Sequence, residues 1–235
     1  MKRTFLIIIS LCCVIFNASA IQLYSSRVIY NEGQNEGQKE VLFRIKNESD
    51  TSPYLVQSWV SKFNSEDVSD DFIIIPPLIN LTPESVNNLR IIFSSNHNLP
   101  ARYESIYRLN ILSIPAVEDT DTTKVTLTTK LSLKLIYRPV GLTYNEAKEA
   151  HKKLSAKKNG NSIIIENPTP YFVNLKEVSL NTGNIDREQF LKISTIEPFG
   201  TVAFESKSLN AHTINILAID DYGATHKSQI TFDGI

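Results

Sequence analysis

The stretch that decides the fold is VTLTTKLSLKLIYRP, residues 125 to 139. Its odd-numbered positions carry apolar side chains apart from Thr129, and its even-numbered positions before Ile136 are polar. Alternation with a period of two over this length is typical of a β-strand with one buried face. A strand in a globular protein usually has about five or six residues. We therefore expect part of this strand to extend beyond the sheet of its own domain.

The first twenty residues have the pattern of a secretory signal peptide. A basic start at Lys2 and Arg3 precedes an apolar run from Phe5 to Phe16, and small residues follow up to Ala20. The apolar run is shorter than the roughly 18 residues that a membrane-spanning helix needs. We expect cleavage after Ala20, export of residues 21–235 and no insertion of the mature chain into a membrane.

Composition excludes several classes of protein. The two cysteines, Cys12 and Cys13, lie in the predicted signal peptide, so the mature chain would have neither a disulfide framework nor thiol chemistry. Such a chain depends on a large core, and 235 residues with 42% hydrophobic content can form one. The formal net charge of −1 becomes −3 without Lys2 and Arg3. This balance gives no electrostatic argument for binding nucleic acid or an anionic membrane.

Short alternating runs recur through the mature chain and predict an all-β protein. Seven of them precede residue 139, separated by turn-rich segments, as in an antiparallel β-sandwich. The polar, lysine-rich residues 145–161 contain the only predicted helix, and we expect little helix outside residues 144–158. Further short runs follow, among them FLKIST at residues 190–195, which we interpret as a strand. Two domains of roughly 100 residues are therefore predicted, residues 21–139 and 140–235.

No motif indicates an enzyme or a metal site. The four histidines are scattered, and none has the spacing of a zinc site. His226 lies near Asp220 and Asp221, but a loop histidine beside acids is more often simply solvated. The sequence contains no nucleophile elbow, phosphate-binding glycine loop or dinucleotide fingerprint. We expect no catalytic residue, no metal and no cofactor.

Six segments together carry a family resemblance. They are SSRVIY (25–30), FIIIPPLINLTPESVNNLRIIF (72–93), YESIYRLNILSIP (103–115), KLIYRP (134–139), ENPTPYFVNL (166–175) and DDYGA (220–224). In this order they resemble the periplasmic, PapD-like chaperones of the chaperone–usher pilus pathway, over nearly the whole mature chain. The resemblance implies two immunoglobulin-like β-sandwich domains at an angle, with a cleft between them. It also implies a periplasmic location and two partners, pilus subunits and an outer-membrane usher.

The segment before the strand at residues 125–139 refines the resemblance. SIPAVEDTDT, residues 113–122, is brief and free of cysteine. It is similar to the same segment in the short-loop group of these chaperones, named for the loop between strands F1 and G1. That group is usually associated with rod-like pili.

The resemblance also implies a use for the strand at residues 125–139. In this family the chaperone lends a strand to an incomplete subunit, and such donor-strand complementation between chaperone and pilin is a well-known example of β-augmentation. We expect Leu133, Leu135 and Tyr137 to face the chaperone's own core. The predicted donor residues are Val125, Leu127, Thr129 and Leu131.

Two basic residues match the pair that binds the subunit's terminal carboxylate in this family. Arg27 and Lys134 offer charge-assisted hydrogen bonds to one carboxylate, and we expect neither to have a comparable partner within the chain. Strict alternation puts Lys134 on the face opposite Leu127 and Leu133. Either the strand is twisted or bulged, or the anchor and the donor residues point to different sides.

Three charged residues match the family's residues at the domain junction, where they hold the angle between the domains. These residues are Glu104, Arg138 and Asp221. If they were separate surface charges, each would contribute little to stability.

Two other functions are weighed against this one. A pilus subunit or adhesin of the same pathway usually has a cysteine pair and a donor peptide at the mature start, and this chain has neither. A periplasmic β-sandwich hydrolase would need a nucleophile and a base, for which no motif is present. Whether the protein self-associates when no client is bound is left open.

Overall fold

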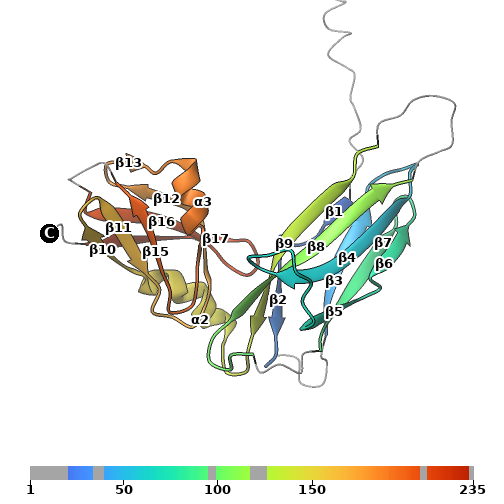
Figure 1. Cartoon of the computed structure of the whole chain (residues 1–235), viewed down its shortest axis with the longest axis horizontal. Helices are drawn as coiled ribbons and strands as arrows, with labels where there is room; N and C mark the ends of the chain where they lie inside the picture. The colour runs from blue at the N-terminus through green and yellow to red at the C-terminus, as the bar shows by residue number, and fades with distance from the viewer. Residues whose placement is uncertain (1–20, 34–39, 95–98, 117–125, 207–210, 233–235) are drawn as a thin grey trace, which may run out of the picture.

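The chain forms two lobes of β-strands, set at an angle and joined at one end (Figure 1). The computed structural model describes residues 21–33, 40–94, 99–116, 126–206 and 211–232. One hydrophobic core is built from buried residues between Ile21 and Tyr137, and a second from buried residues between Ala150 and Phe232. The predicted class, all-β with two sandwich domains, is confirmed. The predicted bounds 21–139 and 140–235 stay a proposal.

The first lobe packs two sheets face to face. The apolar residues of each strand alternate with exposed ones, so each sheet turns one face to the shared core, as in β3 with its buried Phe43 and Ile45. In order, one sheet contains β1 (Ile21–Leu23), β3 (Glu40–Asn47), β7 (Val86–Phe93) and β5 (Phe72–Ile75). The other contains β2 (Arg27–Asn31), β9 (Thr129–Arg138), β8 (Ser105–Pro115), β4 (Tyr54–Lys62) and β6 (Leu78–Leu81).

One strand pair departs from the predicted antiparallel sandwich. β2 pairs with β9 in parallel, from Arg27 beside Lys134 to Asn31 beside Arg138. The other pairs in the described ranges are antiparallel. Alternation in a sequence indicates which face of a strand is buried, but it contains no information on the direction of the neighbouring strand. This pairing could therefore not be predicted from the pattern.

The second lobe is a smaller sandwich that begins after a short helical segment. The helix α2 (Tyr144–Glu149) is capped by Thr143, whose hydroxyl accepts from Glu146 N, and it continues into the 3₁₀ turn η1 (Ala150–Lys153). One sheet contains β10 (Ser155–Asn159), β11 (Ser162–Glu166) and β15 (Thr201–Glu205). The other contains β13 (Gly183–Asn184), β12 (Val173–Leu180), β16 (Thr213–Ile219) and β17 (Thr225–Thr231), with β14 (Thr195–Ile196) beside β12.

One prediction for this lobe is wrong. FLKIST is not a strand: most of it belongs to helix α3 (Arg187–Ile193), so helix also occurs outside residues 144–158. Asp186 caps the helix by accepting from Gln189 N at 2.9 Å, and Phe190 and Ile193 then pack on the core. An acid followed three residues later by glutamine resembles a helix-start signal. The lysine-rich segment contains the predicted helical turns, α2 and η1, and then ends as strand β10, which pairs with β11.

Strand β9 is shorter than the sequence predicted. Residues 126–128 are not in a strand, and Val125 lies outside the described residues. The ladder with β8 ends where Thr129 pairs with Ser113, although β8 itself continues to Pro115. Pairing with β8 runs from Thr129 to Tyr137 without a register shift, which excludes a bulge there. The side chain of the predicted anchor Lys134 therefore points to the face of the sheet opposite the face of Leu131 and Leu133.

Candidate functional site

Three cations form a row across the sheet of the first lobe where it meets the second lobe. Lys134 on β9 is paired with Arg27 on β2 and with Arg108 on β8. Directly paired residues on neighbouring strands project from the same face, and the strands lie about 4.8 Å apart. We call Arg27, Lys134 and Arg108 the cation row. Sequence reasoning found the first two and missed Arg108, because its place depends on the register between β8 and β9.

A row of oxygen atoms on the second lobe faces the cation row. Arg27 Nη1 donates to the carbonyl oxygen of Ile219 at 3.4 Å. Lys134 Nζ donates to Asn174 Oδ1 at 2.6 Å and to Thr195 Oγ1 at 2.5 Å. Asn174 on β12 is paired with Ile219 on one side and with Thr195 on the other, so the acceptors come from adjacent strands. The expectation that the two anchors have no partner inside the chain is therefore wrong, although these partners are neutral.

The electrostatics of the row favour an incoming anion. Burial lowers the pKa of Lys134 to about 8, and the nearby charge of Arg27 contributes to this shift. Burial also lowers the pKa of Arg27, while Asp221 and Asp220 oppose that shift. Arg27 Nε is buried and has no hydrogen-bond partner among the described residues. A carboxylate at this position would offset the desolvation of both cations and satisfy a buried donor.

Lys134 and Arg108 line a cleft between the lobes. Phe63 and Asn64 join them from the first lobe, and the opposite wall is formed by residues between Leu191 and Val202. Glu197 is the only acid among the lining residues, against three cations, Lys134, Arg108 and Lys192. The cleft is thus bordered by excess positive charge, in the place where the resemblance puts the client's terminus.

Strand β9 has an unpaired edge beside the cation row. β2 covers one side of β9 only from Lys134 onward, so in the described part of the chain Thr129 to Leu133 have no strand on that side. Leu127, just beyond the strand, is 77% exposed, and Thr129 is also exposed. Leu131 is half-buried, while Leu135 and Tyr137 are buried in the core as expected. Of the predicted donor residues, Thr129 and Leu131 thus lie on a free edge of β9, and Leu127 lies just before it.

The three predicted junction residues come together between the lobes. Arg138 Nε donates to Glu104 Oε1 at 2.6 Å, and its two terminal nitrogens donate to the carboxylate of Asp221 at 2.7 and 3.2 Å. Glu104 Oε2 accepts from Phe172 N at 2.7 Å, and Glu104 N donates to the carbonyl of Pro170. Burial raises the pKa of Glu104 to about 7, although the Arg138 guanidinium opposes the rise.

His226 contacts one of the two acids that lie near it in the sequence, Asp220. Its Nε2 lies 2.9 Å from Asp220 Oδ2, and its ring stacks on His151 at 5.8 Å between centroids. Asp220 also accepts from the backbone N–H of Tyr222 and of Ala224, so this carboxylate braces the turn between β16 and β17. Within the described ranges, no group of three or more metal-ligating side chains is present.

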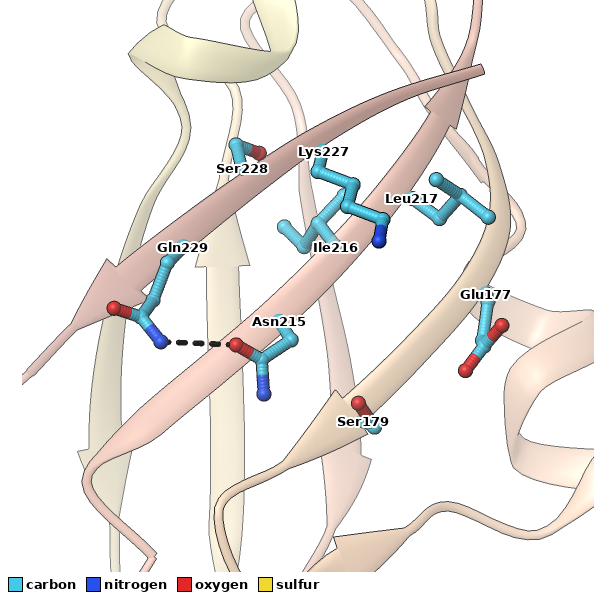
Figure 2. Close-up of a pocket in the computed structure, with 8 residues that line it drawn as sticks. All are labelled: Glu177, Ser179, Asn215, Ile216, Leu217, Lys227, Ser228 and Gln229. Atoms are coloured by element: carbon cyan, nitrogen blue, oxygen red, sulfur yellow. Dashed lines mark hydrogen bonds between the residues drawn. The ribbon is translucent and has the colours of Figure 1, made fainter.

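A separate hollow lies on the second lobe (Figure 2). It is formed on β12, β16 and β17, where Gln229 Nε2 donates to Asn215 Oδ1 at 2.9 Å. Its charged residues are Glu177 and Lys227, and none of its lining residues belongs to the first lobe. It is therefore distinct from the cleft. In the part of the chain that the structure describes, no helix is long and apolar enough to span a membrane.

Lys134 should make the stability of the free protein depend on pH in the alkaline range. Its pKa of about 8 is below the ordinary 10.5, so between these values the unfolded chain binds a proton that the folded chain does not. The wild type should therefore gain stability relative to Lys134→Met as pH rises from 8 to 10. Melting temperatures of both proteins across this range measure the gain. The exposed Lys157, changed to methionine, is the control; a difference between wild type and Lys134→Met that is flat over this range would show that Lys134 is not desolvated.

Two protein-family models match the chain. "Pili and flagellar-assembly chaperone, PapD N-terminal domain" matches residues 20–143, and "Pili assembly chaperone PapD, C-terminal domain" matches residues 149–230. Together these matches cover both lobes.

Several known proteins are similar over most of their length. The chaperone protein FimC of Escherichia coli O6:H1 is 34% identical over 209 residues, which are 88% of this chain and 81% of FimC. The chaperone protein MrkB of Klebsiella pneumoniae is 30% identical over 231 residues, 93% of this chain and 96% of MrkB. The crystal structure of the periplasmic chaperone SfaE is 28% identical, with a TM-score of 0.72 over 91% of this chain and 98% of that one. A chain of the SafA pilin–SafB chaperone complex of Salmonella enterica has the same fold at 23% identity, with a TM-score of 0.78 over 92% of this chain and 98% of that one.

Proposed function

The chain belongs to the PapD family of pilus-assembly chaperones, and we propose that it binds pilus subunits in the cleft by donor-strand complementation. The chaperone keeps each subunit from aggregating and delivers it to an outer-membrane usher. SfaE is described as periplasmic, and the signal-like start of this chain supports the same location. The relatives named above are chaperones, which favours this function over that of a pilus subunit or a hydrolase.

The observation that carries the proposal is the free edge of β9 next to the cation row. A subunit strand added to Thr129–Leu133 would lie in line with β2, because both occupy the same side of β9. The end of that strand would then reach the position of Arg27 and Lys134. Leu127 and Leu131, with Val125 beyond the described residues, would enter the subunit's apolar groove while the backbone forms the ladder.

The buried charges of Glu104, Arg138 and Asp221 have a supporting part in this proposal. They tie the start of β8 and the end of β9 to the segments around Phe172 and Asp221. We propose that this network fixes the angle between the lobes and with it the width of the cleft. The client's strand and its terminal carboxylate could then be bound at one fixed distance.

Co-expression with a pilus subunit from the same genome tests the proposal. A tagged copy of the chain should bring down the subunit at one-to-one stoichiometry from periplasmic extracts, and the subunit expressed alone should aggregate or be degraded. A subunit that accumulates in soluble form without the chain, and that never copurifies with it, would contradict the function.

Leu127→Glu should abolish client capture and leave the free protein stable. An unpaired charge buried in an apolar groove costs several kcal/mol by the general rule, whereas Leu127 of the free protein is exposed. The measurement is subunit yield in pull-down, beside the melting temperature of the free variant. Thr128→Glu is the matched control, because Thr128 is also exposed and its side chain would point to the other face once the segment is paired as a strand. Unfolding of free Leu127→Glu would place Leu127 in the chaperone's own core and refute its donor role.

A further inference from the structure

We propose that Arg108 binds a second carboxylate of the client, carried by the side chain of its C-terminal residue. The inference rests on the proposed function, in which Arg27 and Lys134 hold the terminal carboxylate itself. It adds a specificity-determining residue to the cleft: the preferred client would end in an acidic residue.

The place of Arg108 is the first argument. It is paired with Lys134 across β8 and β9, and both residues line the cleft between the lobes. Arg27, on the other side of Lys134, instead lines a different hollow beside Tyr144 and Tyr222. Of the two arginines of the cation row, Arg108 is therefore the one that shares the open cleft with Lys134.

The surroundings of Arg108 are the second argument. Its guanidinium stacks on Phe63, with Cζ 5.2 Å from the ring centroid, which holds the side chain over the wall of the cleft. No carboxylate among the described residues forms an ion pair with it; the nearby Glu66 pairs with Lys130 instead. A half-buried arginine that is held in place and lacks an acid is suited to a charged ligand, because its planar fork matches a carboxylate.

The spacing of the row is the third argument. Residues paired on adjacent strands lie about 4.8 Å apart, which is comparable to the separation of the two carboxylates of a C-terminal glutamate. One carboxylate can thus meet Lys134 while the other meets Arg108. Lys192 on the facing wall adds positive charge, but it is exposed and pairs with Glu188.

Four synthetic peptides test the inference. Each has twelve residues that alternate apolar residues with threonine, and ends in glutamate or glutamine, as the free acid or as the amide. Binding to the purified protein is measured by fluorescence anisotropy. The wild type should bind the glutamate free acid about tenfold more tightly than the glutamine free acid, the lower end of the effect expected for one charged hydrogen bond.

Variants assign that preference to Arg108. Arg108→Gln should lose the preference for glutamate and keep the preference for free acid over amide, while Arg108→Lys should retain part of the glutamate preference. Lys192→Gln removes the same charge from the same cleft and should keep it in full. Equal binding of the two free acids by the wild type, or a preference that survives in Arg108→Gln, would overturn the inference.

A different result would refute the proposed function itself. If the wild type does not distinguish free acids from amides, or binds none of the four peptides, the carboxylate site itself is wrong and the inference falls with it. If the free acids are preferred but glutamate and glutamine bind alike, only the role of Arg108 is refuted.

Discussion

Arg138→Met should lower the free energy of unfolding by about 3–5 kcal/mol, the usual cost of removing one partner from a buried ion pair. The side chain of Arg138 is 2% exposed and that of Glu104 1%, so the Glu104 carboxylate would lose its ion-pair partner without gaining water. The bidentate contact with Asp221, which joins the lobes, would be lost too. Urea unfolding of the full chain measures the change.

Arg90→Met is the matched control for this prediction. Arg90 also pairs with a glutamate, Glu40, at 2.6 Å, but its side chain is 49% exposed. Exposed pairs contribute about 0–1 kcal/mol, so this variant should be close to wild type. If Arg138→Met cost no more than Arg90→Met, the junction network would not stabilise the protein.

The loss of unfolding free energy caused by Arg138→Met should also increase with pH. Burial already raises the pKa of Glu104 to about 7, and Arg138 restrains that rise. Without Arg138 the pKa of the folded state moves higher, while the unfolded value stays near the ordinary 4.5. A raised pKa in the folded state means that stability is lost as pH rises above the unfolded value. The difference between wild type and variant should therefore be smaller at pH 5 than at pH 8.

Arg27→Ala or Lys134→Ala should each weaken client capture roughly ten- to a hundredfold. Each change removes a hydrogen bond to a charged group, which contributes about 1.5–3 kcal/mol. The effect of the double variant should be less than the sum of the two, because both residues bind one carboxylate. The yield of subunit complex is the readout, and the exposed Lys157→Ala is the control.

The stability of the free variants distinguishes a client-binding role of Arg27 and Lys134 from a structural role. The partners of both cations within the chain are neutral oxygens, so their removal leaves no buried acid unpaired. Each free variant should melt near or above the wild-type temperature, because each change also removes a cation that burial disfavours. Loss of stability in step with loss of capture would mean that the two cations hold the lobes together, and capture at the wild-type level would mean that they do not touch the client.

The sequence predicted the parts of the fold that depend on which side of a strand is buried. The alternation around Leu135 and Tyr137 correctly predicts a core-facing side of β9. It missed helix α3, because the run FLKIST is too short for its apolar pattern to separate strand from helix; the signal for the helix lies before the run, in Asp186 followed by Gln189. Local pattern is least informative in runs of this length.

The candidate site, too, could be predicted from the sequence only in part. The resemblance singled out Arg27 and Lys134, and the structure places them side by side on β2 and β9. The same contact required a parallel pair of strands that lie far apart in sequence, which no local pattern encodes. Arg108 was missed for the same reason, because its meaning comes from the register of β8 against β9. Long-range register is fixed by the packing of the whole sheet.

Hydrogen exchange of the free chaperone and of its subunit complex tests the central claim most directly, that a client strand pairs with the open edge of β9. In peptides covering residues 126–133, the amides that do not face β8 should exchange fast in the free protein and slowly in the complex, because the client would satisfy their free backbone groups. Peptides from β17 in the second lobe should be unchanged. Protection confined to the second lobe, with the same amides of residues 126–133 still exchanging fast in the complex, would contradict the account.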